Sequence, residues 1–198
     1  MPATYTVSLV EGGKVVDSKH LKVAFDPDVH FAPGEHERYN AIVVDLHAVQ
    51  RRGTEAAGAL NKLYPQMTDA AKKVGENSSI PANVKTQFES LNKEFDAVRK
   101  KFGVPLNAGG AGRGGGGGGG RGAAADPENV LARTSGLKNQ LMSVWEAPSA
   151  SMVRQYTEVK LAMPKAVTDA NALLTRAASV SQALKKYDIT LTVPPPVK

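Results

Sequence analysis

The residues best suited to bind a metal ion gather around the start of the first predicted helix. Zinc ligands on one helix lie three or four residues apart, so that their side chains share a face. His36 and His47 are eleven residues apart, and no His-Glu-x-x-His spacing exists. We therefore interpret the group as ordinary polar residues near a helix start, and we expect no metal. Its members are His30, Glu35, His36, Glu37, Asp45 and His47.

Catalytic residues leave no local signature in the sequence. Neither a nucleophilic triad nor a pair of glycosidase carboxylates can be recognised. The Glu-x-x-His pairs of di-iron helical bundles are also missing. The chain has no cysteine, which removes thiolate chemistry and disulfides. The sequence predicts a protein that is not an enzyme and that uses no cofactor.

A glycine run interrupts the helical part of the chain. Gly114–Gly120 is flanked by Arg113 and Arg121 and is not followed by the Gly-Lys-Ser/Thr of a phosphate-binding loop. Such a segment buries too little surface to offset the entropy of ordering it, so we predict a flexible linker. Arginines set in glycine also occur in RNA-binding segments. Nucleic-acid binding is therefore the weaker alternative, and it would require a steep dependence on salt.

The composition is that of an ordinary globular protein. Of the 198 residues, 41% are hydrophobic and 22% are charged, which predicts about one domain with a buried core. The net charge of +6 permits an acidic partner but does not demand nucleic acid. No apolar run is long enough to span a membrane, and no charged-then-apolar leader opens the chain.

Apolar residues alternate at spacings of three and four over most of the chain, which predicts helices with coiled-coil-like seams. These seams run from Tyr39 to Val74, from Val84 to Phe102, from Val130 to Val144 and from Met152 to Tyr187. The predicted fold is mainly α, an antiparallel bundle of two long and two short helices. We expect four helices side by side in one half of the bundle and two in the other, with both chain ends at the two-helix end.

The first residues predict a β-hairpin. Tyr5, Val7 and Leu9 alternate with polar residues, a Gly-Gly turn follows, and Leu21, Val23 and Phe25 form the second apolar row. A lone hairpin is only marginally stable in water, so its apolar side needs a cover. We expect residues 189–193 to add a third strand. The candidate partner-docking edge comprises Tyr5, Val7, Leu9, Leu21, Val23 and Phe25.

The predicted organisation has five parts. They are a β-hairpin or partial Ig-like element (1–32), a first helical hairpin (33–103), a Gly-rich flexible linker (104–126), a second helical hairpin (127–188) and a strand-like Pro-rich tail (189–198).

Two stretches, ATYTV at Ala3–Val7 and LKVAFDPDV at Leu21–Val29, flank a glycine-containing turn and precede paired helices with a Gly-rich interruption. This order resembles the C-terminal region of secreted bacterial sialidase-type or sortilin-like β-propeller proteins, namely their last Ig-like strand pair and helical extension. The resemblance covers essentially the whole chain and implies a periplasmic or secreted location. The propeller with its Asp-box repeats is missing from this sequence, so the glycosyl-hydrolase label of that family does not transfer to it.

We therefore expect a non-enzymatic interaction or docking module, an accessory subunit or C-terminal extension in the bacterial cell envelope. Its partner would be a protein or a larger envelope complex, and the heptad seams also permit self-association. The alternative is a fragment of a β-propeller protein whose strand pair completes an Ig-like domain supplied by the upstream region. An open hairpin edge would indicate that another polypeptide fills it.

Overall fold

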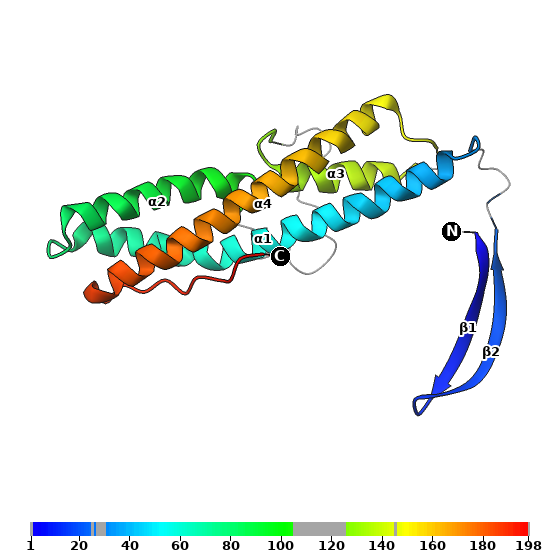
Figure 1. Cartoon of the computed structure of the whole chain (residues 1–198), viewed down its shortest axis with the longest axis horizontal. Helices are drawn as coiled ribbons and strands as arrows, with labels where there is room; N and C mark the ends of the chain where they lie inside the picture. The colour runs from blue at the N-terminus through cyan, green and yellow to red at the C-terminus, as the bar shows by residue number, and fades with distance from the viewer. Residues whose placement is uncertain (1, 25, 27–30, 105–125, 145, 198) are drawn as a thin grey trace.

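The structure is a computed structural model that describes residues 2–24, 26, 31–104, 126–144 and 146–197. It is a helical rod with a β-hairpin standing at one end (Figure 1). The predicted mainly α fold with an N-terminal hairpin is confirmed. The elements are β1 (Ala3–Glu11), β2 (Lys14–Val23), α1 (Glu35–Glu76), α2 (Ala82–Lys100), α3 (Val130–Met142), α4 (Ala150–Leu184) and the 3-10 turn η1 (Lys185–Tyr187).

The two long helices run in the same direction (Figure 1). The prediction of four helices in one half of the bundle and two in the other is therefore wrong. Asp45 in the first half of α1 bonds Tyr156 in the first half of α4. Gln66 in the second half of α1 bonds Thr192, just beyond the end of α4. Helices α2 and α3 lie end to end, each covering one half of the long pair. Three helices therefore lie side by side in both halves, instead of four in one and two in the other.

Helix lengths explain this arrangement. At 1.5 Å per residue, α1 and α4 are about 63 and 53 Å long, whereas α2 and α3 are about 29 and 20 Å long. Only the two short helices together can cover the long pair. Where they meet, the Leu131 N–H donates to the Lys101 carbonyl at 3.3 Å. Gly103 turns the chain there with a φ of +65°, and the Asn129 side chain occupies the place of a Cβ.

The predicted seams form the core of the rod. One cluster joins the second halves of α1 and α4 to α2, and Phe95 stacks on Tyr64 within it at 6.2 Å between ring centroids. A smaller cluster joins the first halves of α1 and α4 to α3, and its buried members are Ile42, Leu46, Leu137, Leu141 and Val159. Helices α1 and α4 continue through Pro65 and Pro164. Spacing alone therefore identified the buried faces correctly.

The predicted third strand at residues 189–193 is wrong. The part of the chain that the structure describes holds one sheet, which contains only β1 and β2. The tail instead runs back along the helices, at the end of the rod away from the hairpin (Figure 1). Ile189 and Leu191 are buried in the helical core. Their alternation with polar residues therefore marks burial against helices rather than pairing in a sheet.

Side chains of the rod hold the backbone of this tail. The Leu191 N–H donates to Ser181 Oγ at 2.9 Å, and the Ser181 hydroxyl donates to the Leu191 carbonyl at 3.1 Å. The side-chain amide of Gln66 accepts from the Thr192 N–H and donates to the Thr192 carbonyl. The side-chain amide of Asn171 makes the same two hydrogen bonds with Val197. These bonds replace the ladder that a third strand would have provided.

Replacing Phe95 with Ala should lower the free energy of unfolding by about 3–5 kcal/mol, because a buried ring leaves a cavity that the core fills only in part. Leu161→Ala is the control, since Leu161 is 73% exposed and should change stability by less than about 0.5 kcal/mol. Denaturant unfolding followed by circular dichroism measures both. A loss below about 1 kcal/mol for Phe95→Ala would contradict the core assignment.

Replacing Ser181 with Ala should cost about 1–3 kcal/mol, because the buried N–H and carbonyl of Leu191 lose their partner. Ser179→Ala, two residues away on the exposed side of α4, is the matched control and should cost less than about 0.5 kcal/mol. Equal effects of the two changes in denaturant unfolding would show that the tail does not depend on this contact.

Candidate interaction surface

The hairpin is a regular antiparallel ribbon. Tyr5 lies opposite Leu21, and Ala3 lies opposite Val23. Gly12 and Gly13 close the turn with φ values of +57° and +80°, which a two-residue hairpin turn of this type requires at both central positions. Because residues that lie opposite each other point to the same face, the two predicted apolar rows share one face and meet at Tyr5 and Leu21. Val7 and Leu9 lie opposite Lys19 and Asp17 on this face, which we call the apolar face.

The opposite face of the ribbon is polar. Thr6 Oγ1 lies 3.4 Å from His20 Nδ1, and the Ser8 and Ser18 hydroxyls lie 2.9 Å apart. Both pairs bridge the two strands, so they fix the register from the polar side. The hairpin is therefore amphipathic across its thickness, as the alternation in the sequence predicts.

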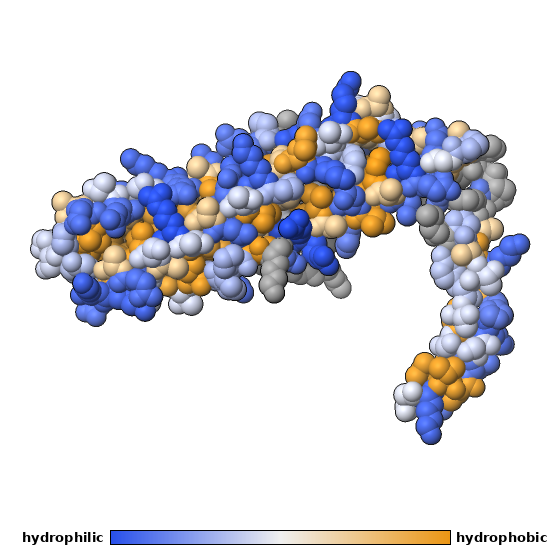
Figure 2. Space-filling view, viewed as in Figure 1, coloured by the Kyte–Doolittle hydropathy of each residue, from blue (hydrophilic) through white to orange (hydrophobic). Residues whose placement is uncertain are grey.

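The apolar face of the ribbon is exposed. No helix of the described chain contacts either strand, and Figure 2 shows hydrophobic surface gathered at the tip of the hairpin, the end away from the rod. The exposed fractions of its large apolar residues are 43% for Tyr5, 56% for Val7, 64% for Leu9, 54% for Leu21 and 39% for Val23. Phe25, the sixth predicted docking residue, lies outside the described residues.

Sequence reasoning missed the valines at the tip of the hairpin. Val10, Val15 and Val16 are each more than half exposed. The register shifts between Leu9 and Val10, because β2 carries one extra residue there. The alternation of β1 places Val10 on the face of Thr6 and Ser8, and the bulge breaks the alternation of β2 before Val15 and Val16, so the predicted apolar rows did not include these valines.

Both outer edges of the hairpin lack a further strand within the described part of the chain. An edge strand presents backbone N–H and carbonyl groups that can pair with another chain. The exposed apolar face and the two edges therefore form one surface, which we call the hairpin surface. It comprises β1 and β2.

A second feature is a polar cluster between the first halves of α1 and α4. The Tyr156 hydroxyl donates to the Asp45 carboxylate at 2.6 Å. Lys160 Nζ lies 2.9 Å from both the Tyr156 hydroxyl and an Asp45 oxygen. The Tyr156–Lys160 spacing of one helical turn is visible in the sequence, but Asp45 is 111 residues away and only the fold brings it near.

The pKa shifts in this cluster favour a structural role. The hydrogen bond from Tyr156, aided by Lys160, lowers the pKa of Asp45. Burial and the bond to Asp45 raise the pKa of Tyr156, and the bonds to Tyr156 and Asp45 raise that of Lys160. A general base or nucleophile at neutral pH needs the opposite shifts in tyrosine and lysine. The cluster holds α1 to α4 with its groups in their ordinary charge states.

The candidate metal ligands are not brought together. Among the described residues, no three His, Asp or Glu side chains are placed so that they could hold a metal ion. The Glu35 carboxylate accepts from the Ala32 N–H at 2.9 Å, and the His36 ring packs edge-on against Phe31. His47 is exposed. His30 lies outside the described residues.

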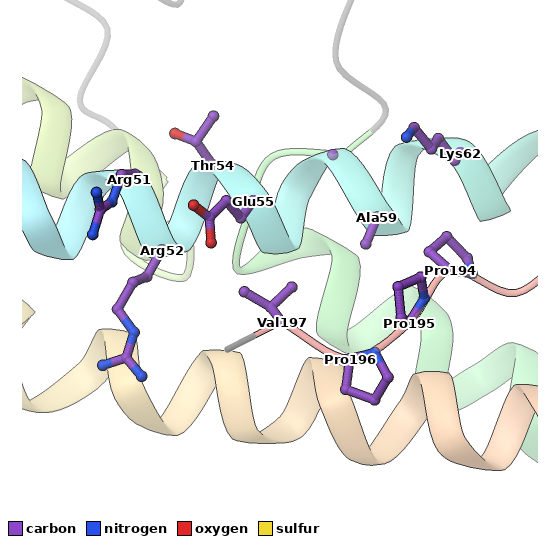
Figure 3. Close-up of a pocket in the computed structure, with 11 residues that line it drawn as sticks. Arg51, Arg52, Thr54, Glu55, Ala59, Lys62, Pro194, Pro195, Pro196 and Val197 are labelled. Atoms are coloured by element: carbon purple, nitrogen blue, oxygen red, sulfur yellow. The ribbon is translucent and has the colours of Figure 1, made fainter.

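A solvent-open groove of about 710 Å³ lies between α1 and the C-terminal tail. Arg51, Arg52 and Lys62 line it from α1, with Glu55 among them, and Pro194–Val197 line it from the tail (Figure 3). Its wide opening and mixed charge do not specify a ligand. Arg113 and Arg121, which carried the nucleic-acid alternative, lie outside the described residues.

No family model, curated protein or solved structure matches the chain. The resemblance to β-propeller proteins therefore stays a prediction. In the ranges that the structure describes, no helix has the length and apolar character needed to cross a membrane. The hairpin surface is the feature on which a functional proposal can be built.

Replacing Asp45 with Asn should make stability less dependent on acid pH. The folded chain lowers the pKa of Asp45, so its contribution to stability is present above about pH 4 and is lost as the pH falls through the folded pKa. The difference in unfolding free energy between wild type and Asp45→Asn should therefore be constant near neutral pH and shrink below about pH 4.

Denaturant unfolding at a series of pH values measures this difference. Asp69→Asn, which removes an exposed carboxylate from the same helix, is the control for the loss of one charge. A difference for Asp45→Asn that does not change with pH would contradict the assigned role of the cluster.

Proposed function

We propose that the chain is a non-enzymatic docking module in which the helical rod carries the hairpin, and the hairpin joins the β-structure of a protein partner. The observation that carries the proposal is the exposed apolar face of the hairpin surface, with Leu9 64% and Val7 56% exposed and no helix against them. Exposed apolar patches of this kind mark interaction sites on folded proteins.

The partner is expected to supply β-structure because of what the hairpin lacks. A two-stranded ribbon is marginally stable alone, and three or more strands with a buried apolar face are needed for independent stability. Its open edges offer backbone groups in the geometry of a strand. A β-strand from a partner would satisfy one edge and would also place apolar side chains beside Tyr5, Val7 and Leu9.

The rod supports a spacing and presenting role. Its core consists of two clusters, the Ile42 cluster in the half nearer the hairpin and the Phe95 cluster in the other half. The Asp45–Tyr156–Lys160 cluster fastens α1 to α4 at the end nearest the hairpin, where its pKa shifts favour structure over catalysis. A rigid rod of this kind holds the hairpin at a fixed end and leaves it accessible.

The resemblance to secreted β-propeller proteins suggests where docking takes place. It would set the module in the bacterial cell envelope as an accessory subunit or a C-terminal extension. In the alternative form, the β-structure belongs to an Ig-like domain upstream in the same polypeptide. The open edges of the hairpin surface agree with either source, since both add a strand.

The test is capture from extracts of the producing cells with the tagged full chain, quantified by mass spectrometry. Wild type is compared with Val7→Glu on the apolar face and with Ser18→Glu on the polar face. Val7 lies opposite Lys19, so the new carboxylate faces a cation and the hairpin itself is not destabilised. Circular dichroism checks that the rod is intact.

The proposal expects a protein, which can be an untagged copy of this chain, that wild type and Ser18→Glu capture equally. Val7→Glu should capture it at least about tenfold less, because a buried carboxylate opposes an apolar contact. Equal capture by all three chains, or no protein captured above background by wild type, would contradict docking through the hairpin.

A further inference from the structure

The two strands of the hairpin surface differ in how well their edges are protected. Residues 3–10 of β1 carry no charge. β2 carries Lys14, Asp17, Lys19 and Lys22, together with the extra residue of the bulge. Charged residues, lysine above all, and bulges are the devices by which sheets prevent edge-to-edge pairing. The edge of β2 is therefore protected against pairing with another strand, whereas the edge of β1 is not.

β1 is also complementary to itself. If two copies pair antiparallel about Thr6, Tyr5 faces Val7 and Ala3 faces Leu9 of the second copy. If they pair about Val7, Tyr5 faces Leu9. The Thr6 register sets apolar residues against apolar residues on one face and hydroxyl residues against hydroxyl residues on the other, because the side-chain period is two. The Val7 register also sets Ala3 against Glu11 and Thr4 against Val10, so the match favours the Thr6 register. A surface that matches its own copy is what a two-fold interface requires.

Pairing of β2 with itself has no such match. An antiparallel pair centred on Lys19 sets Lys19 against its own copy. One centred on Ser18 sets Lys14 against Lys22, and it also sets Asp17 against Lys19. Like charges directly opposite each other destabilise a sheet. Pairing through β2 therefore places like charges opposite each other in both registers, which pairing of β1 about Thr6 avoids.

The position of the hairpin leaves room for a second chain. No helix of the described residues contacts β1, and the ribbon stands clear of the rod (Figure 1). The net charge of +6 on each chain repels a second copy. Salt screens that repulsion, whereas the contact between two β1 strands centred on Thr6 contains no charge.

We propose that the partner of the hairpin surface is a second copy of this chain, with β1 paired antiparallel to β1 across a two-fold axis. The product is a four-stranded sheet in the order β2–β1–β1–β2, which exceeds the number of strands that a stable sheet needs. The inference rests on the proposed docking function and names its partner. It assigns β1 as the contact edge and β2 as the outer edge.

The experiment is sedimentation equilibrium of the full chain over micromolar to sub-millimolar concentrations. Val7→Glu on β1 is compared with Leu21→Glu on β2. These residues lie on the same face and are 56% and 54% exposed, and each substitution adds one negative charge. Only Val7 lies on the proposed contact strand, at or next to the dimer axis. Helical circular dichroism shows that each variant keeps its rod.

Wild type should form a dimer whose dissociation constant does not rise with added salt. Val7→Glu should raise that constant about tenfold or more, because the substitution acts twice across the two-fold axis. Leu21→Glu should raise it less than about threefold. Wild type that stays monomeric at every concentration overturns the inference, as does an equal effect of the two variants.

A second measurement locates the axis directly. The chain has no cysteine, so Thr6→Cys and Val7→Cys each introduce a single thiol. One of the two should form a disulfide-linked dimer in a glutathione redox buffer more completely than Ser18→Cys, the control on β2. Equal cross-linking of all three overturns pairing through β1. If the chain stays monomeric but Val7→Glu still loses a different captured protein, the docking proposal holds and only the choice of partner fails.

Discussion

The parallel packing of α1 against α4 determines where every other element lies. Near Gly53 of α1, a Cβ would come within 2.7 Å of the Met163 side chain on α4, so the absence of a side chain there lets the helices approach closely. Because the two long helices run in the same direction, the groove beside them extends over the full rod and is about as long as α2 and α3 together. Helices α2 and α3 occupy it in turn. The tail then fills the remaining groove beside the second halves of α1 and α4.

This arrangement leaves the hairpin outside the core. The rod satisfies its own apolar seams, and the tail that was expected to cover the hairpin is bound by Ser181, Gln66 and Asn171 at the other end. The apolar face of the ribbon is thus unused by the fold. Most of the exposed large apolar residues of the described chain lie on the hairpin, Leu9 and Val7 among them, and an interaction would explain such a surface.

The sequence predicted the local elements well and their assembly poorly. Spacing identified Leu60, Phe95 and Leu173 as core residues because a helix repeats its buried face every three or four positions. It could not give the direction of α4 relative to α1, since both directions bury the same seams.

The alternation of Ile189 and Leu191 showed that one side of the tail is buried, but an extended segment alternates in the same way against helices as in a sheet. The sequence placed the exposed apolar residues of the hairpin, other than Phe25, on one face because a hairpin is local. The Asp45–Tyr156 contact was missed because it depends on the assembly.

The most direct test of the account is amide hydrogen exchange of the full chain at low and high protein concentration, resolved along the sequence. The account predicts that amides of residues 3–10 exchange rapidly in dilute protein and become protected as the concentration rises. Amides in the cores of α1 to α4 should be protected at both concentrations. Protection that rises on a helix face, or a hairpin whose exchange does not change with concentration, would contradict the pairing of β1 with a second copy of the chain.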